Sequence, residues 1–152
     1  MNQSRRQFMT RVGKSVAFLV AVVNLPRVVW ANWSASAFGA TDLDTAIVER
    51  YGNLAIADSD AIQLKAPSIA ENGAVVPISI ATTLAAKSIS VFVEKNPSPL
   101  SCSFNIQPRM DTDVSVRIRM GATSNLIVLV EADGKLYRTS QEVKVTIGGC
   151  GG

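Results

Sequence analysis

Most of the chain alternates between apolar and polar residues with a period of two, which is typical of β-strands that have one buried face. Residues 126–130 are instead continuously apolar, as in a strand that is covered on both faces, and residues 103–106 fit a further short strand. The segments that alternate are residues 62–66, 76–81, 88–93, 114–120 and 143–147. The pattern therefore predicts an all-β chain of about seven short strands.

Short polar segments separate these runs and supply the turns. Asp133-Gly134 is a sequence typical of a two-residue β-hairpin loop. Asn72-Gly73 and the proline-containing residues 96–99 give further turn signals. Strands of this number and spacing favour an immunoglobulin-like β-sandwich.

One proline interrupts an otherwise regular strand pattern. Pro77 lies within the alternating segment 76–81 and has no N–H group to donate to a neighbouring strand. We therefore expect an edge or a β-bulge at this position. Because an uncovered edge strand tends to pair with other chains, the proline also indicates a partner protein.

One stretch with helical spacing precedes the strands. Leu43, Ile47 and Tyr51 recur every four residues, so one face of a helix would be apolar. Asp42 is suited to accept hydrogen bonds from the free N–H groups at the start of this helix, and Gly52 is suited to end it. We expect a short helix that runs to about Arg50.

The first 37 residues have the order of an export signal, with a basic start, an apolar middle and a small-residue end. Arg5 and Arg6, followed by Phe8, resemble a twin-arginine signal, whose export route carries folded proteins. The alternative is an N-terminal membrane anchor, although the apolar run at residues 16–23 is short for a membrane span. The signal predicts a periplasmic protein that leaves the membrane after cleavage.

The expected cleavage site divides the chain. Ala35-Ser36-Ala37 predicts cleavage after residue 37, and Val29-Trp30-Ala31 is a second candidate. The predicted organisation is thus a cleaved signal at residues 1–37, a sandwich domain at residues 38–147 and a C-terminal arm at residues 148–152.

Charge and composition exclude several functions. The chain has 15 basic and 12 acidic residues, but five of the basic ones lie in the first 37 residues, where no acidic residue occurs. The remaining body has 10 basic against 12 acidic residues, which argues against a nucleic-acid partner. The chain has no histidine and two cysteines, which excludes serine triads, zincin sites and four-thiolate metal sites. We expect no metal and no cofactor.

The last five residues, Gly148-Gly149-Cys150-Gly151-Gly152, combine one nucleophile with four glycines. Glycine allows wide backbone freedom, and the chain from Ile147 to Cys150 reaches roughly 10 Å when extended. The local sequence holds no base, cation or helix N-terminus that would lower the pKa of the thiol. We therefore interpret this segment as a slim, swinging carrier arm on which Cys150 is activated by a partner, not as a self-sufficient catalytic site.

Three other interpretations of the tail remain open. The first is an incidental glycine-rich end with no function. The second is the tail of a ubiquitin-like sulfur carrier, which would use the carboxylate of the terminal Gly-Gly. The third is an exported structural domain in which Cys150 forms an interchain disulfide. The ubiquitin-like alternative requires a β-grasp fold and a cytosolic activating enzyme, which fit poorly with the export signal and with the many alternating segments.

The C-terminal sequence resembles that of the SoxY family, the sulfur-carrier subunits of the periplasmic thiosulfate-oxidising (Sox) system. The resemblance covers essentially the whole mature chain and rests on residues 143–152 (VKVTIGGCGG), 65–67, 69–77, 93–97 and 117–121. It implies an immunoglobulin-like fold and a complex with SoxZ, as a heterodimer or a higher oligomer. It also implies that Cys150 holds sulfur intermediates, including a persulfide. SoxAX would couple thiosulfate to the thiol, SoxB would release sulfate, and SoxCD would oxidise the remaining sulfane sulfur.

Cys102 is a departure from the family resemblance, which leads us to expect no cysteine at this position. A free cysteine often behaves as a small apolar residue, so we interpret Cys102 as a small buried residue on a strand. A regulatory disulfide with Cys150 is the alternative, but it would block the carrier.

Overall fold

The computed structural model describes residues 34–146, which form two helices and nine strands. The helices are α2 (Ala35–Gly39) and α3 (Leu43–Tyr51). The strands are β1 (Ile56–Asp58), β2 (Ile62–Lys65), β3 (Ile69–Ala70), β4 (Val76–Thr82), β5 (Ser88–Val93), β6 (Leu100–Asn105), β7 (Val114–Ile118), β8 (Ser124–Ala132) and β9 (Lys135–Val145).

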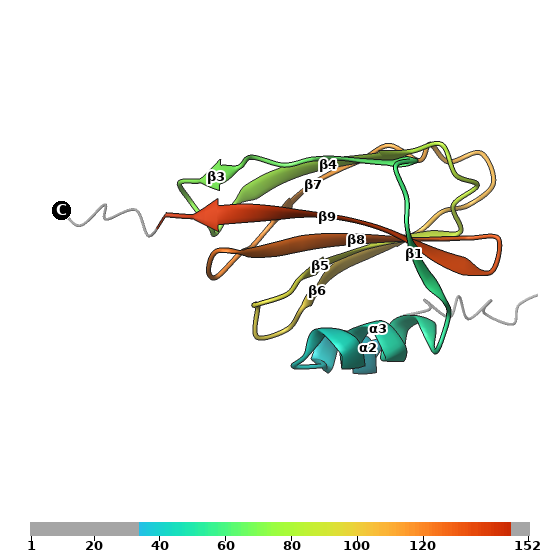
Figure 1. Ribbon diagram of the computed structural model, residues 1–152, viewed down its shortest axis with the longest axis horizontal. Coiled ribbons are helices and arrows are strands. Elements are labelled where there is room, and N and C mark those ends of the chain that lie inside the picture. The colour runs from blue at the N-terminus through green and yellow to red at the C-terminus, as the bar shows by residue number, and fades with distance from the viewer. Residues whose placement is uncertain (1–33, 147–152) are drawn as a thin grey trace, which may run out of the picture. The chain divides into compact units, whose positions relative to one another are not determined.

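The strands build two sheets that face each other. The larger sheet has the order β1-β9-β8-β5-β6, and the short strand β3 also pairs with β9. The smaller sheet has the order β2-β4-β7. It covers one face of the larger sheet, while α2 and α3 lie against the other face (Figure 1). The predicted all-β, immunoglobulin-like sandwich is confirmed, and it is not the β-grasp fold of ubiquitin-like carriers.

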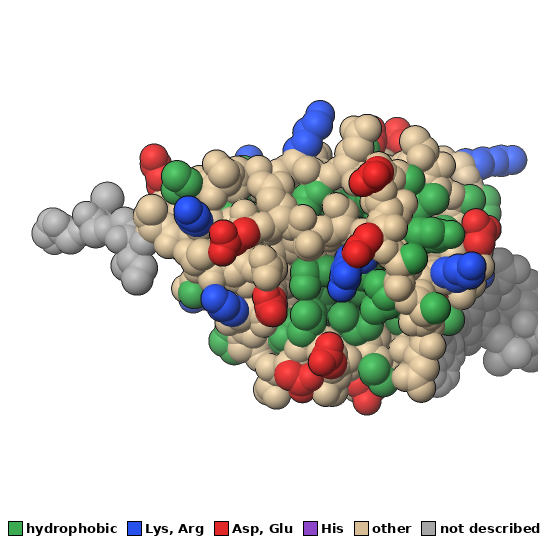
Figure 2. All heavy atoms as spheres, viewed as in Figure 1, with side chains coloured by type: hydrophobic (Ala, Val, Ile, Leu, Met, Phe, Trp, Pro, Cys, Tyr) green, Lys and Arg blue, Asp and Glu red, His purple; other side chains and the backbone are tan. Residues whose placement is uncertain are grey.

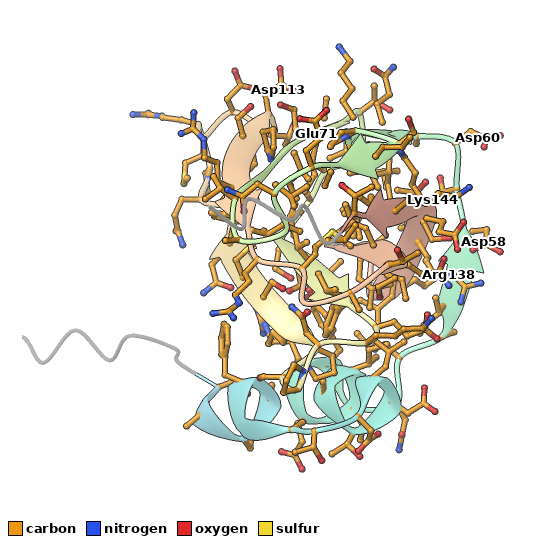
Figure 3. All side chains as sticks on the ribbon, turned by 90° about the vertical axis from the view of Figure 1, so that its left-hand side faces the viewer. Asp58, Asp60, Glu71, Asp113, Arg138 and Lys144 are labelled. Carbon is orange, nitrogen blue, oxygen red and sulfur yellow. The ribbon has the colours of Figure 1, made fainter. Side chains whose placement is uncertain are left out.

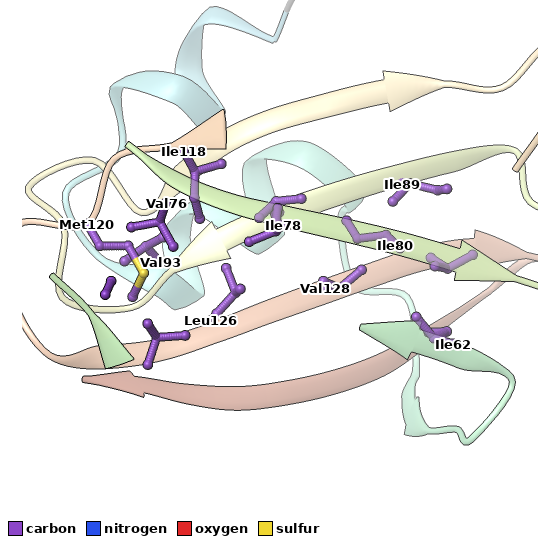
Figure 4. Packing of buried hydrophobic residues seen from close by; sticks show 14 residues of the cluster. Ile62, Val76, Ile78, Ile80, Ile89, Val93, Ile118, Met120, Leu126 and Val128 are labelled. Atoms are coloured by element: carbon purple, nitrogen blue, oxygen red, sulfur yellow. The ribbon is translucent and has the colours of Figure 1, made fainter. Parts of the chain in front are cut away.

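The core between the sheets comes from the inward-facing residues of the alternating segments. Ile78 and Ile80 of β4 face Val128 of β8 and Ile89 of β5 (Figure 4). These side chains are at most 2% exposed. Burial of apolar surface on this scale is the main stabilising contribution to such a fold, at about 25 cal/mol per Å².

A second apolar cluster lies between the helices and the larger sheet. Ala37 of α2 and Ala46 of α3 are fully buried there, against Phe92 of β5 and Leu129 of β8. Strand β5 is therefore buried along its whole length on both faces. No helix within residues 34–146 has the length and apolar character needed to cross a membrane.

A chain of hydroxyl groups fixes α3 on the sheet. The Tyr51 hydroxyl donates to Ser90 Oγ at 2.6 Å and accepts from Ser88 Oγ at 3.2 Å. Ser90 in turn donates to Ser103 Oγ at 2.8 Å, which also accepts from Arg50 Nε at 3.1 Å. Burial raises the pKa of Tyr51 above its ordinary value, so the phenol stays neutral and able to donate.

The predicted helix and hairpin are both confirmed. Asp42 caps α3 by accepting from the Thr45 N–H at 2.8 Å, and the Gly52 N–H donates to the Val48 carbonyl at 2.7 Å. Asp133 and Gly134 have φ values of 51° and 73°, the left-handed backbone that a tight hairpin turn needs.

Strand β9 is much longer than the predicted strand at residues 143–147. It pairs with β8 from Lys135 to Val143. The first part of β9 was not predicted, because two of its inward-facing residues, Thr139 and Gln141, are polar and interrupt the alternation of apolar and polar residues. Gln141 is accommodated because its side-chain amide donates to the Ala66 carbonyl at 3.1 Å.

Pro77 lies in the central strand of the smaller sheet, but at a point where that strand has one neighbour. β4 pairs with β7 through residues 76–80, whereas β2 pairs only with residues 79–82. The edge expected at Pro77 is therefore present only over this short stretch of β4, because β4 as a whole is the central strand of its sheet. Proline brings no N–H donor to this short open stretch, which lowers its ability to pair with a further strand.

Candidate functional site

The predicted site residues lie outside the described part of the chain. These are Cys150, Gly148, Gly149, Gly151 and Gly152 of the arm, and Arg5 and Arg6 of the signal. The structure does describe the residues that lead up to the arm: β9 ends at Val145, and Thr146 is the last described residue. We call this region, residues 68–75, 120–123 and 144–146, the arm base.

Backbone hydrogen bonds hold one side of the arm base. The Lys144 N–H donates to the Ser68 carbonyl at 3.0 Å, and the Thr146 N–H donates to the Ala70 carbonyl at 3.1 Å. These bonds are the parallel pairing of β3 with the end of β9. A strand of two residues carries no hydrophobic pattern of its own, so sequence reasoning missed it.

A side chain holds the other side. The β8–β9 ladder ends at the pair Ser124–Val143, so Val145 has no backbone partner from β8. The Val145 N–H donates instead to Thr123 Oγ1 at 3.0 Å, and the Thr123 hydroxyl donates to the Val145 carbonyl at 3.5 Å. No sequence motif marks Thr123, because its role depends on where a ladder between other residues ends.

Gly73 is needed for close packing at the arm base. Its carbonyl accepts from the Met120 N–H at 2.7 Å. A Cβ atom on residue 73 would lie 2.8 Å from Val145 Cγ1 and closer still to the Met120 carbonyl oxygen, where no Cβ fits. The sequence identified Gly73 as a turn residue, but its packing against the last residue of β9 became apparent only from the structure.

Both charged and apolar side chains surround the arm base. Glu71 and Lys144 lie at this end of the protein (Figure 3). Ile69 and Val75 are 54% and 49% exposed.

On the face shown in Figure 2, hydrophobic side chains also gather between β9 and the helices, where the second cluster nears the surface. Within residues 34–146, no group of three or more His, Cys, Asp or Glu residues is placed to hold a metal ion.

Cys102 is on β6 and packs, partly buried, against the core between the sheets. It is a free thiol, and burial raises its pKa to about 11. Cys102 is thus a small residue on a strand, as interpreted, but it is partly and not fully buried. Because the thiolate is the nucleophile, a thiol with this pKa is nearly inert at neutral pH. Within residues 34–146, the structure therefore shows no thiol that is reactive at neutral pH.

The raised pKa predicts selective labelling. At pH 7.5 iodoacetamide should modify one thiol per native chain, Cys150, and a second only after denaturation. Above about pH 9, Cys102 loses its proton in the unfolded chain, whereas the folded protein keeps it protonated up to about pH 11. Ionisation therefore stabilises the unfolded chain over this pH range. Stability should therefore fall as the pH rises through this range. Rapid labelling of two thiols in the native protein at pH 7.5, measured by intact mass, would contradict the burial of Cys102.

Comparisons with known proteins give a consistent result. Residues 47–150 match the family model described as sulfur oxidation protein SoxY. The chain is also similar to the solved structure of the sulfur carrier protein SoxY from Chlorobium limicola f thiosulfatophilum. The two share 54% sequence identity with a TM-score of 0.64, over 70% of this chain and 97% of the other. No curated protein matches the chain.

Proposed function

Because the chain belongs to the SoxY family of sulfur oxidation proteins, we propose that it carries thiosulfate-derived sulfur on the thiol of Cys150 and presents it to separate enzymes. One observation supports this most directly. The family match runs from residue 47 to residue 150 and so includes the cysteine between the two glycine pairs. The proposed role is that of a substrate carrier, not of an enzyme.

The proposed chemistry begins with oxidative coupling. The Cys150 thiol and thiosulfate join through a new S–S bond, with loss of one proton and two electrons. SoxAX, a haem-containing partner, accepts the electrons. SoxB then adds water across the terminal sulfur–sulfur bond, which releases sulfate and two protons and leaves a persulfide anion on Cys150. Where SoxCD is present, it oxidises this remaining sulfur.

The residues of this chain supply reach and attachment. A cysteine thiol has an ordinary pKa of about 8.5, so one flanked only by glycines is a few per cent thiolate at pH 7. We infer that a partner's active site provides the base or cation that activates it. Four glycines keep the approach narrow, so that the sulfur and the adjacent backbone both enter a cleft. SoxZ is the proposed stable partner.

We also propose that the protein reaches the periplasm by the twin-arginine route. Of the two candidate cleavage sites, the one after Ala31 is favoured. Helix α2 spans residue 37, and the Ala37 side chain is 0% exposed in the cluster beneath the helices. Cleavage after residue 37 would remove most of this packed helix, whereas cleavage after Ala31 leaves α2 complete.

Intact mass of the mature protein, purified from cells growing on thiosulfate, tests this proposal. We expect adducts of sulfur or thiosulfonate that dithiothreitol removes, and an N-terminus at Asn32. A Cys102→Ser variant should carry the same adducts, because Cys102 is partly buried and burial raises its pKa to about 11. A stoichiometric disulfide-linked dimer with no adducts would instead indicate the structural alternative and overturn the carrier role.

A further inference from the structure

The last residues of β9 are bonded on both sides by groups that lie far away in the sequence. Along a strand, successive backbone N–H and C=O groups point to alternate sides. Lys144 and Thr146 accordingly bond to Ser68 and Ala70 on one side, and Val145 bonds to Thr123 on the other. Three consecutive residues are thus held beyond the last pair of the β8–β9 ladder, Ser124–Val143.

Thr123 takes the place of a missing strand at this point. Its hydroxyl oxygen accepts from the Val145 N–H at 3.0 Å, and the hydroxyl donates to the Val145 carbonyl oxygen, 3.5 Å from Thr123 Oγ1. One side chain therefore contacts both polar backbone groups that a continued β8 would have paired. Without the hydroxyl, β3 alone would hold the end of β9, through two paired residues.

We propose that Thr123 is a positioning residue that holds residues 144–146 on the body and so limits how far the carrier arm, residues 148–152, can carry Cys150. This rests on the function proposed for Cys150. With Thr146 held in place, the four following residues span at most roughly 14 Å to Cys150, at 3.3–3.6 Å per residue. If residues 144–146 come free, Val143 is the last residue held by the β8–β9 ladder, and the maximum reach to Cys150 grows to roughly 24 Å.

A longer free segment lowers the efficiency of delivery. Each additional unrestrained residue must be ordered again when the thiol enters a partner's active site, and ordering a residue has an entropic cost. The local concentration of a tethered group also falls once the tether exceeds the span it must bridge. Holding residues 144–146 on the body therefore favours loading of Cys150, although Thr123 never contacts the sulfur.

The test compares Thr123→Val, which keeps the shape but removes the hydroxyl, with Thr123→Ser, which keeps the hydroxyl. Both are made in the mature protein complexed with SoxZ. In Thr123→Val we expect faster hydrogen exchange at the Val145 and Thr146 amides. We expect the rate of SoxAX-dependent loading with thiosulfate to fall by about tenfold. Alkylation of Cys150 by iodoacetamide should stay at the wild-type rate, and Thr123→Ser should restore both exchange protection and loading.

A second variant tests arm length without altering Thr123. Two glycines inserted after Gly149 should slow loading as Thr123→Val does, with wild-type exchange at Val145. If the insertion leaves loading unchanged, arm length does not matter and the inference is wrong, even if Thr123→Val fails to fold. Wild-type exchange in Thr123→Val, or faster exchange with wild-type loading, would also overturn it. If wild-type Cys150 is never loaded, the proposed function fails, while the exchange data still report on Thr123.

Discussion

A Cys150→Ser variant is expected to lose all detectable thiosulfate-dependent turnover in a reconstituted Sox system while it keeps the wild-type fold. A serine hydroxyl cannot form the sulfur–sulfur bond that we propose for the loaded carrier. The other cysteine cannot substitute, because Cys102 is packed against the core and burial raises its pKa to about 11. Residue 150 follows β9, the last strand of the described residues 34–146, by five positions, so we expect the free energy of unfolding to change by less than about 0.5 kcal/mol. Turnover assays and thermal denaturation measure the two effects.

Cys102→Ser is the matched control for this experiment. Serine is close to cysteine in size, and position 102 is partly buried on β6, so we expect a modest loss of stability and nearly wild-type turnover. Normal turnover by a folded Cys150→Ser protein would exclude Cys150 as the carrier. Loss of turnover in Cys102→Ser, with the fold intact, would instead identify Cys102 on β6 as the essential thiol.

The sequence was sufficient for elements whose signals are local. The cap of α3 by Asp42 and the tight turn at Asp133-Gly134 depend on residues next to each other in the chain, and both were predicted. Strands whose existence depends on a distant partner were missed. β1 is exposed at all three residues, and it forms because it lies parallel to β9, where Arg138 also pairs with Asp58 at 2.7 Å.

The same distinction applies to the functional site. Cys150 is apparent from the sequence because its setting, glycines on both sides, is contiguous. The arm base is not, because it joins Ser68–Ala70, Gly73, Thr123 and Val145, which are brought together only by the fold. Thr123 resembles any other loop threonine until the end of the β8–β9 ladder is known.

Replacing both Gly149 and Gly151 with valine is expected to separate access by small reagents from access by enzymes. Valine adds β-branched bulk on both sides of Cys150 and restricts the backbone angles that glycine allows. The thiol remains, and no charged group is added beside it, so iodoacetamide should label Cys150 at nearly the wild-type rate. Loading by SoxAX should fall by about tenfold to a hundredfold, because the enzyme must admit the flanking backbone in a defined geometry along with the sulfur.

Both rates should be measured in the same preparation of this Gly149→Val, Gly151→Val variant. Wild-type values for both would show that the partner's cleft is wide, and the idea of a slim arm would be wrong. A parallel loss of both rates would show that valine shields the thiol itself. The arm base serves as the internal reference, since hydrogen exchange at Val145 and Thr146 should match the wild type. Unchanged exchange with slower loading then assigns the defect to the bulk next to Cys150, whereas release of residues 144–146 would raise the exchange rate at these two amides.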